Sequence, residues 1–332
     1  MFSPLRSWIA AWVAGGQLAA VGGQLADSQT AYLTSFQTLS PGISKAEFAE
    51  QWKRYGIVML GFEDSPGFLE HAFPKMDGFM QDHKLVRHRI SASNNVSANP
   101  TNTSTGVSPL RIRFHQYSQL APADETVQGP HQEGASATRG NRRAIAFVCE
   151  KPADRDGGTA LFDMQRAWEL LPADLKARLA GAHWALTQHD ESQLLVPAVV
   201  RHDLTGQPCL QFYCFGGPAR DCVDVYRHRT GRFDARPDPY TYEMHPERDV
   251  VLVEANGTQS PFVGLDLYRM LTSVYSAMIA HSWTGGQALL VDNIRWAHAR
   301  LDGSGPKRKV HFFYYGPEDR SFNLWKLERP SL

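Results

Sequence analysis

Runs of alternating apolar and polar residues recur along the chain and predict a protein built mainly of β-strands. Aromatic and β-branched residues dominate these runs, as is typical of strands that pack on at least one face. We expect strands in LRIRFHQYSQL (110–120), RRAIAFVCE (142–150), CLQFYCF (209–215), DVVLVEA (249–255), QALLVDN (287–293) and KVHFFYY (309–315).

Three segments with helical patterns lie between or before these strands. The stretch SKAEFAEQWKRYG starts at Ser44 and has Glu47 three residues later, which is a capping box, and the strand IVMLGF should follow it. In DMQRAWELLPADLKARLAG, Asp163 is the expected N-cap, and Pro172 should divide the segment into two helices. The stretch GLDLYRMLTSVYSAMIAHSW predicts one helix over 264–283.

The N-terminal residues 1–43 are expected to form a helical extension. An amphipathic stripe with helical spacing is formed by Leu5, Trp8, Ile9, Trp12 and Val13. Such a stripe suits packing or contact between copies of the chain. Its apolar character with one early arginine is also similar to a secretory signal, and this alternative stays open. No run reaches the ~18 continuous apolar residues of a membrane span.

Residues 44–332 are predicted to form a single domain, because no Pro/Gly-rich linker divides them. The predicted fold class is β-rich α+β. A Ser-, Asn- and Thr-rich stretch at 91–109 is expected to be a long loop, which is either a lid or disordered. A second insertion, at about 216–249, is expected to shape a substrate pocket.

Composition and charge narrow the choice of partners. The 34 Lys and Arg residues balance the 34 Asp and Glu residues, so no net field recruits nucleic acid or an anionic membrane. The balanced charge suits a small-molecule substrate. The four cysteines form no CxxC pair, and a chain of this length needs no disulfide, so we expect reduced thiols in a cytoplasmic protein.

The stretch VQGPHQEGAS places His131 and Glu133 two residues apart. On an extended chain such residues point to the same side, whereas on a helix they diverge by about 200°. The preceding Gly-Pro disfavours a helix. The pair alone is weak evidence for a metal site, but His298 follows an apolar strand and supplies a second imidazole. Two histidines and one carboxylate make the facial triad of non-haem Fe(II) oxygenases. Arg308 suits an oxo-acid carboxylate as a planar bidentate donor.

Four motifs in order resemble those of the taurine dioxygenase and clavaminate synthase-like superfamily of Fe(II)/2-oxoglutarate-dependent dioxygenases. They are HQE (131–133), DGGTALFD (156–163), VDNIRWAHAR (291–300) and KRKVHFF (307–313), within a resemblance that spans roughly 45–316. The resemblance implies a double-stranded β-helix (jelly-roll) core with flanking helices, and the use of Fe(II), 2-oxoglutarate and O2. By carry-over, the expected iron ligands are His131, Glu133 and His298. Thr159 and Arg308 resemble the pair that binds the 2-oxoglutarate carboxylate.

Several positions depart from the family pattern or stay open. Glu133 replaces the commoner aspartate and remains an anionic oxygen ligand. Related halogenases have a small residue there, so a carboxylate indicates hydroxylation or a related oxidation. Lys307 and Lys309 flank Arg308, so the anchoring cation could be one residue away. Arg300 is a candidate substrate contact.

The resemblance implies hydroxylation of an unactivated C–H bond in a small polar metabolite, amino-acid-like or carboxylate-bearing, with release of succinate and CO2. Four alternatives remain. The same cofactors could drive desaturation or cyclisation, or the chain could be a non-catalytic jelly-roll that binds metal as a sensor. A cupin-like metalloenzyme would use no oxo-acid, and Thr159 would then be only a turn residue and Arg308 a solvated one. The motifs RFHQY and PHQEG are also similar to the small amino-acid hydroxylase branch.

Overall fold

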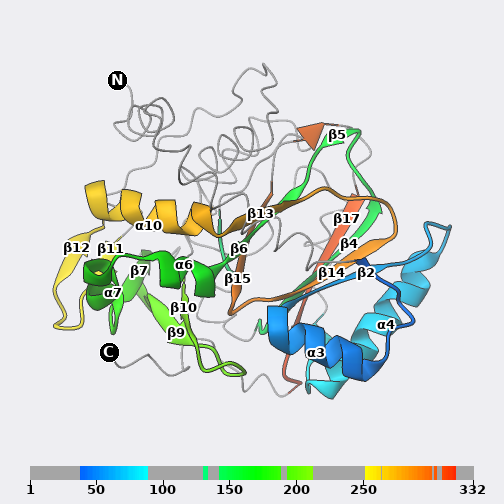
Figure 1. The fold of residues 1–332 in the computed structure, drawn as a ribbon, viewed down its shortest axis with the longest axis horizontal. Coiled ribbons are helices and arrows are strands. Elements are labelled where there is room, and N and C mark those ends of the chain that lie inside the picture. The colour runs from blue at the N-terminus through cyan, green and yellow to red at the C-terminus, as the bar shows by residue number, and fades with distance from the viewer. Residues whose placement is uncertain are drawn as a thin grey trace.

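A computed structural model of the 332-residue chain (Figure 1) describes residues 38–88, 130–133, 142–187, 193–211, 251–262, 264–300, 303–304 and 309–318. Two β-sheets face each other across an apolar layer at the centre of the described fold, and helices cover the other face of each sheet. The predicted β-rich fold with flanking helices is confirmed.

The larger sheet has six strands in the order β1-β2-β14-β4-β17-β3. β1 and β2 are parallel, and the other neighbours are antiparallel. The strands are β1 (Thr38–Leu39), β2 (Ile57–Gly61), β3 (Val86–His88), β4 (Ala144–Lys151), β14 (Gln287–Asp292) and β17 (Lys309–Gly316). The strands predicted in IVMLGF, RRAIAFVCE, QALLVDN and KVHFFYY are therefore confirmed. β1 lies within the segment that the sequence assigns to the N-terminal extension.

The smaller sheet is antiparallel and consists of β13 (Met278–His281), β6 (Thr159–Asp163) and β15 (Trp296–Arg300), in the order β13-β6-β15. Alternate residues of both sheets meet in one apolar cluster, which includes Ile145 of β4, Leu289 of β14, Leu161 of β6 and Trp296 of β15. Because successive side chains of a strand point to opposite faces, this cluster fills the space between the sheets.

Two helices cover the outer face of the larger sheet, beside β2 in Figure 1. α3 (Lys45–Tyr55) begins at the predicted capping box, in which Ser44 and Glu47 bond each other's backbone N–H groups. It ends at Gly56, which has the left-handed conformation (φ 66°) that favours glycine. α4 (Phe68–Asp82) packs against α3 through Phe48 and Phe79, whose rings stack at 4.3 Å.

Helices α6 (Met164–Leu170), α7 (Ala173–Leu179) and α10 (Gly264–Ser276) belong to the core beyond the smaller sheet. Asp163 caps α6, and Pro172 separates α6 from α7, as predicted. The single helix predicted over 264–283 is wrong in its last third, because residues 278–281 form β13. The apolar residues of this stretch satisfy a helical and a strand pattern alike, and antiparallel pairing with β6 decides for the strand.

Shorter strands complete this side of the molecule. A four-stranded antiparallel sheet has the order β12-β11-β7-β8, and two-stranded pairs form β9–β10 and β5–β16. Their bounds are β5 (Arg155–Asp156), β7 (His183–Thr187), β8 (Gln193–Pro197), β9 (Val199–Arg201), β10 (Pro208–Leu210), β11 (Val251–Val253), β12 (Gln259–Pro261) and β16 (Gly303–Ser304). β11 thus lies within the predicted strand DVVLVEA, and β10 overlaps the predicted strand CLQFYCF at residues 209–210.

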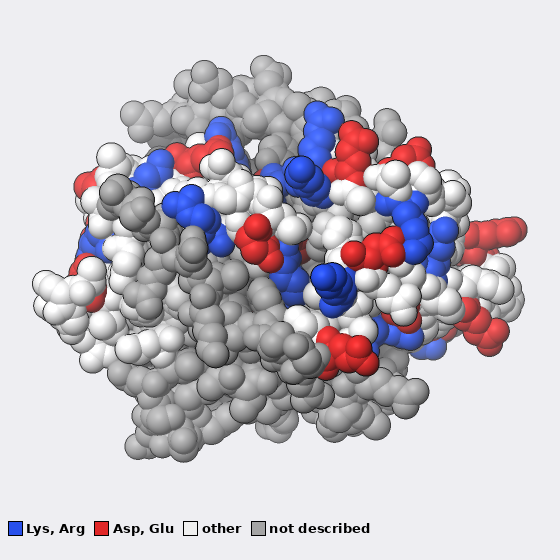
Figure 2. Space-filling view, turned by 90° about the horizontal axis from the view of Figure 1, so that it is seen from below, with Lys and Arg blue, Asp and Glu red and all other residues white. Residues whose placement is uncertain are grey.

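Several predictions lie outside the described residues: the helix before residue 38, the strand at 110–120, the loop at 91–109 and the insertion at 216–249. Within the described part, Cys149 and Cys209 are buried and form no disulfide. No helix in that part is long and apolar enough to cross a membrane. Figure 2 shows acidic and basic side chains interspersed on the face that it presents, in keeping with the balanced charge.

Candidate metal centre

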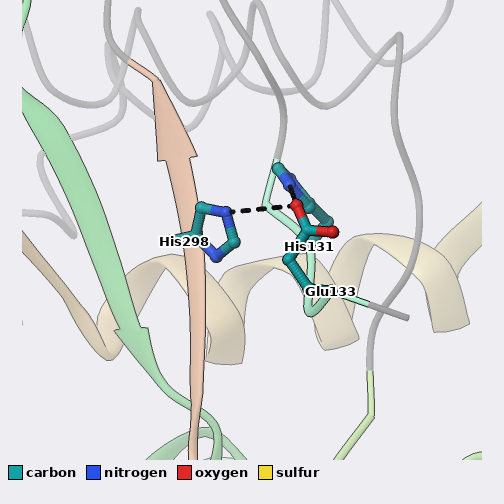
Figure 3. A group of neighbouring side chains, drawn as sticks. All are labelled: His131, Glu133 and His298. Carbon is teal, nitrogen blue, oxygen red and sulfur yellow. Dashed lines mark ion pairs between the residues drawn. The ribbon is translucent and has the colours of Figure 1, made fainter. Parts of the chain in front are cut away.

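His131, Glu133 and His298 come together from two distant parts of the chain (Figure 3). His298 lies on β15, and His131 pairs with it in an isolated antiparallel bridge. The two residues exchange both backbone hydrogen bonds, with N–O distances of 3.0 and 2.9 Å. Their ring centroids are 4.2 Å apart, so the bridge sets the two imidazoles side by side.

The three side chains direct one polar atom each toward a common point. Glu133 Oε1 lies 3.4 Å from His131 Nε2 and 3.8 Å from His298 Nε2. One ligand atom from each residue lies within 4.8 Å of the others. The side chains of His131 and His298 are each 4% exposed, whereas that of Glu133 is 20% exposed. Two imidazole nitrogens and one carboxylate oxygen in a buried cluster fit the donor set that non-haem Fe(II) requires.

The protonation states also fit a metal site. Burial would raise the pKa of Glu133, but the Arg142 guanidinium and the two imidazoles outweigh it and hold that pKa well below its usual range. Burial, followed by the neighbouring His131, lowers the pKa of His298 well below its usual value, against the opposing effect of Glu133. At neutral pH the site therefore offers an ionised carboxylate and an unprotonated His298, which are the forms that bind metal.

The short segment 130–133 is held by side-chain amides. Asn293 Oδ1 accepts a hydrogen bond from Glu133 N (2.9 Å), and Asn293 Nδ2 donates to the carbonyl oxygens of Glu133 (2.8 Å) and Arg142 (2.9 Å). Gln132 Nε2 donates to Ile294 O at 2.7 Å. The turn between β14 and β15 thus carries His298 on one side and fixes the backbone of the other two candidate ligands.

A buried charge network fixes that turn in its place. Asp292 Oδ1 accepts from Arg143 Nη1 (2.6 Å), and Asp292 Oδ2 bonds His202 Nε2 (2.9 Å). Asp292 Oδ1 also accepts from the backbone N–H groups of Ile294 (3.0 Å) and Arg295 (3.3 Å). The turn is therefore tied to Arg143, which directly precedes β4, and to the β9–β10 hairpin through His202.

Arg142 and Asn293 were not singled out from the sequence. Arg142 forms an ion pair with Glu133 and covers the ring of Tyr314, with its guanidinium carbon 4.5 Å from the ring centroid. Asn293 belongs to the motif VDNIRWAHAR, which was the available signal for it, although spacing alone gave it no role. Nothing in the sequence pattern marks Arg142: Glu133 precedes it by nine residues with no recognisable spacing, and Asn293 and Tyr314 lie far along the chain.

Thr159 is buried at the start of β6 and has a specific partner. Trp283 Nε1 donates to Thr159 Oγ1 at 2.9 Å. In the sheet register Thr159 stands opposite His281 on β13 and Arg300 on β15. Only the backbone of Arg300 is described, so its predicted substrate contact remains a prediction. Arg308 lies outside the described residues.

Apolar rings line the space next to the histidines. The Phe147 ring stands edge-on to His298, with centroids 5.2 Å apart, and the Phe312 ring lies 6.3 Å from the same imidazole. Phe147 comes from β4 and Phe312 from β17, so the larger sheet forms this wall. Such a wall restricts water around the cluster, which strengthens the electrostatic interactions within it.

Comparisons with known proteins identify a family in sequence and relatives in structure. The sequence model of the family "Taurine catabolism dioxygenase TauD, TfdA family" matches residues 18–314. The structure is similar to PvcB from Pseudomonas aeruginosa, with a TM-score of 0.51 and 13% identity over 87% of this chain and 86% of PvcB. It is also similar to AAD-2 in complex with Mn(II) and N-oxalylglycine, with a TM-score of 0.50 and 13% identity over 86% and 93% of the two chains. No curated protein sequence gives a significant match.

At 13% identity the two structures bear on the fold alone, and they agree with its β-rich architecture. The family match carries more, because it covers most of the chain, including the three converging side chains and Thr159. The chain belongs to the TauD/TfdA family and is an Fe(II)/2-oxoglutarate-dependent dioxygenase, which uses O2 as its second co-substrate.

Proposed function

We propose that the protein hydroxylates an unactivated C–H bond of a small polar metabolite, amino-acid-like or carboxylate-bearing, with release of succinate and CO2. His131, Glu133 and His298 hold the iron in this proposal. The observation that carries it is the convergence of two imidazole nitrogens and one carboxylate oxygen within 4.8 Å. The substrate class rests on the breadth of the family, and hydroxylation rests on the carboxylate at position 133.

Bound Fe(II), with 2-oxoglutarate and O2, supplies the oxidising chemistry of the family. The protein's part is to bind, to orient and to exclude water. Thr159 Oγ1 accepts its hydrogen bond from Trp283, so the hydroxyl proton remains available for donation to a 2-oxoglutarate carboxylate oxygen. Phe147 and Phe312 keep water from the histidine side of the site.

Arg308 is the proposed partner of Thr159 in binding the 2-oxoglutarate carboxylate. Lys309, which the sequence left as a rival, is engaged elsewhere: its Nζ atom lies 2.7 Å from Glu150 Oε1. His311 bonds the same carboxylate at 2.6 Å and contacts Phe73 of α4, so this group lies on the helix-covered face of the larger sheet. The lysine therefore points away from the apolar layer where Thr159 is found.

The two facing sheets are proposed to be the two halves of a jelly-roll core. Three features support this: the sheets share one apolar layer, helices cover their other faces, and the candidate ligands lie where β15 meets the segment 130–133. A cytoplasmic location and self-association through the helix of the N-terminal extension (residues 1–43) remain predictions. Gel filtration of the chain with and without those residues tests the second.

Succinate formation tests the assignment of the ligands. His131→Ala and Glu133→Ala should each abolish substrate-dependent succinate release, because two remaining donors hold Fe(II) weakly. His71, exposed on α4, is the matched control, and His71→Ala should retain full activity. Retained turnover in both site variants would overturn the triad.

A second measurement separates an enzyme from a sensor that binds metal only. Anaerobic addition of Fe(II) and 2-oxoglutarate to the protein should give a weak visible charge-transfer band, and His131→Ala should lack it. A band without turnover on any compound would favour the non-catalytic alternative. Succinate release across amino acids, their derivatives and sulfonates then identifies the substrate class, and the mass of the product distinguishes hydroxylation from desaturation or cyclisation.

A further inference from the structure

The two carboxylate oxygens of Glu133 have different partners. Oε1 faces the Nε2 atoms of His131 (3.4 Å) and His298 (3.8 Å), whereas Oε2 is bound by Arg142 Nη1. Glutamate has one more rotatable bond than the aspartate that is common at this position, so its carboxylate is harder to fix. An ion pair to one oxygen removes this freedom and leaves the other oxygen directed at the histidines.

Arg142 is itself held at both ends. Its side chain is only 6% exposed, and the guanidinium lies over the face of Tyr314, 4.5 Å from the ring centroid. Its carbonyl oxygen accepts from Asn293 Nδ2 (2.9 Å), the same amide group that bonds the carbonyl oxygen of Glu133 (2.8 Å). The Asn293 amide therefore fixes the backbone of both Glu133 and Arg142. A planar guanidinium that lies over an aromatic ring also has little freedom to rotate.

We propose that Arg142 is a positioning residue that occupies Oε2 of Glu133 and so makes this carboxylate a ligand through Oε1 alone. The proposal rests on the metal role proposed for His131, Glu133 and His298. A bound Fe(II) ion that also held a bidentate oxo-acid and kept one position open would have three positions for protein atoms. A carboxylate that bound through both oxygens would take a fourth position, and the Arg142 ion pair prevents this.

Arginine suits this task for two reasons. Its charge is permanent, so the pair with Oε2 persists at every pH at which Glu133 is ionised. Its planar fork binds carboxylate oxygens with defined geometry, whereas a lysine ammonium is a mobile point charge. Groups that bond metal ligands in this way typically change metal affinity about 10–100-fold when they are removed.

Metal binding without turnover tests the proposal. Arg142→Gln should weaken Mn(II) binding about 10–100-fold, measured from the EPR signal of free Mn(II). It should also change the visible absorption of bound Co(II), which depends on coordination number and geometry. The matched control is Arg166→Gln, which removes an exposed Arg–Glu pair of 2.8 Å on α6 and should change neither readout.

A double-mutant cycle with Glu133→Asp shows whether Arg142 acts through this carboxylate. Aspartate is one methylene shorter and should not reach both Arg142 and the histidines. Arg142→Gln should therefore have little further effect on Mn(II) affinity in the Glu133→Asp background. Equal losses in both backgrounds would mean that Arg142 supports the fold only, and would overturn the proposal.

The outcomes separate this proposal from the one on which it rests. If Arg142→Gln keeps wild-type Mn(II) affinity and the wild-type Co(II) spectrum while His131→Ala loses metal, the positioning role is wrong and the triad stands. Failure of the wild-type protein to bind Mn(II) would refute both. If Arg142→Gln does not fold, Tyr314→Leu removes the ring face beneath the guanidinium and should weaken Mn(II) binding about 3-fold or more. An unchanged affinity in that variant would also overturn the proposal.

Discussion

Replacement of Asp292 by asparagine should destabilise the fold, because this carboxylate is the centre of a buried charge network. Its side chain is 1% exposed and accepts hydrogen bonds from Arg143, His202 and two backbone N–H groups. His202 Nδ1 accepts from Leu204 N (3.2 Å) and Thr205 N (3.1 Å), which places the imidazole proton on Nε2. In Asp292→Asn, an amide N–H in place of Oδ2 would face the Nε2–H of His202, and Arg143 would face a neutral amide instead of a carboxylate.

Removal of one partner from a buried ion pair typically costs about 3–5 kcal/mol. Arg143 keeps a second partner, since its Nη2 atom lies 2.8 Å from Asp203 Oδ1, and the Asp203 side chain is 35% exposed. The remaining pair offsets part of the loss, so we expect Asp292→Asn to lower the free energy of unfolding by about 3 kcal/mol. Asp203→Asn is the matched control and should cost about 1 kcal/mol, because a pair with a partly exposed carboxylate contributes less.

The contribution of the Asp292 carboxylate to the free energy of unfolding should depend on pH. Burial would raise the pKa of Asp292, but Arg143 and His202 outweigh it and hold that pKa far below the usual value. In the unfolded chain the pKa of this carboxyl is about 3.9. Above that pH the unfolded chain is also ionised, and the stabilisation is fully present. Below it the unfolded state binds a proton that the folded state does not, so the stabilisation falls by up to ~1.4 kcal/mol per pH unit.

Urea unfolding, followed by circular dichroism, measures these differences between pH 7 and pH 3. The gap in free energy between wild type and Asp292→Asn should be constant from pH 7 to about pH 5 and should shrink toward pH 3. A gap below about 1 kcal/mol at pH 7, or one that is the same at pH 3, would refute this account of the network. An equal loss of unfolding free energy in Asp203→Asn would show that the greater exposure of Asp203 does not make its ion pair weaker than that of Asp292.

Three further results are expected. Thr159→Val should raise the KM for 2-oxoglutarate about 10-fold or more, because a hydrogen bond to a charged group is lost. Thr159→Ser keeps the hydroxyl and should leave this KM unchanged. Equal KM values in the two variants would contradict the proposed contact. Asn293→Ala should lower the free energy of unfolding by about 2–3 kcal/mol in urea, because three backbone groups lose their partner; a change below about 0.5 kcal/mol would contradict the clamp. Gly286→Ala should destabilise by about 2 kcal/mol or more, because Gly286 has φ 77° and an added Cβ would lie 2.5 Å from Phe62 O. Gly78 lies inside α4, and a Cβ added there would have no atom within 4 Å, so Gly78→Ala should instead raise the free energy of unfolding by about 0.5–1 kcal/mol. A change of the same sign in both glycine variants would refute the comparison.

Local chemistry allowed much of the secondary structure to be predicted from the sequence. The capping box at Ser44 begins α3, and Pro172 separates α6 from α7, because these effects act within a few residues. The spacing of His131 and Glu133 likewise predicted that both side chains would point to one side. Ordered motifs then identified His298 as the third member, and the structure brings it to the pair.

Pairing between distant segments decided what local patterns left open. The stretch 278–281 has a helical pattern, but hydrogen bonds to β6 make it a strand. Asn293 and Arg142 contact Glu133 only because the fold brings the turn after β14 and the residues directly before β4 next to the segment 130–133. Trp283 likewise donates a hydrogen bond to Thr159, which lies 124 positions away in the sequence. Sequence spacing determines which side chains lie on one face of an element. The hydrogen bonds and charges that orient a candidate ligand come from other elements, so only the tertiary structure fixes them.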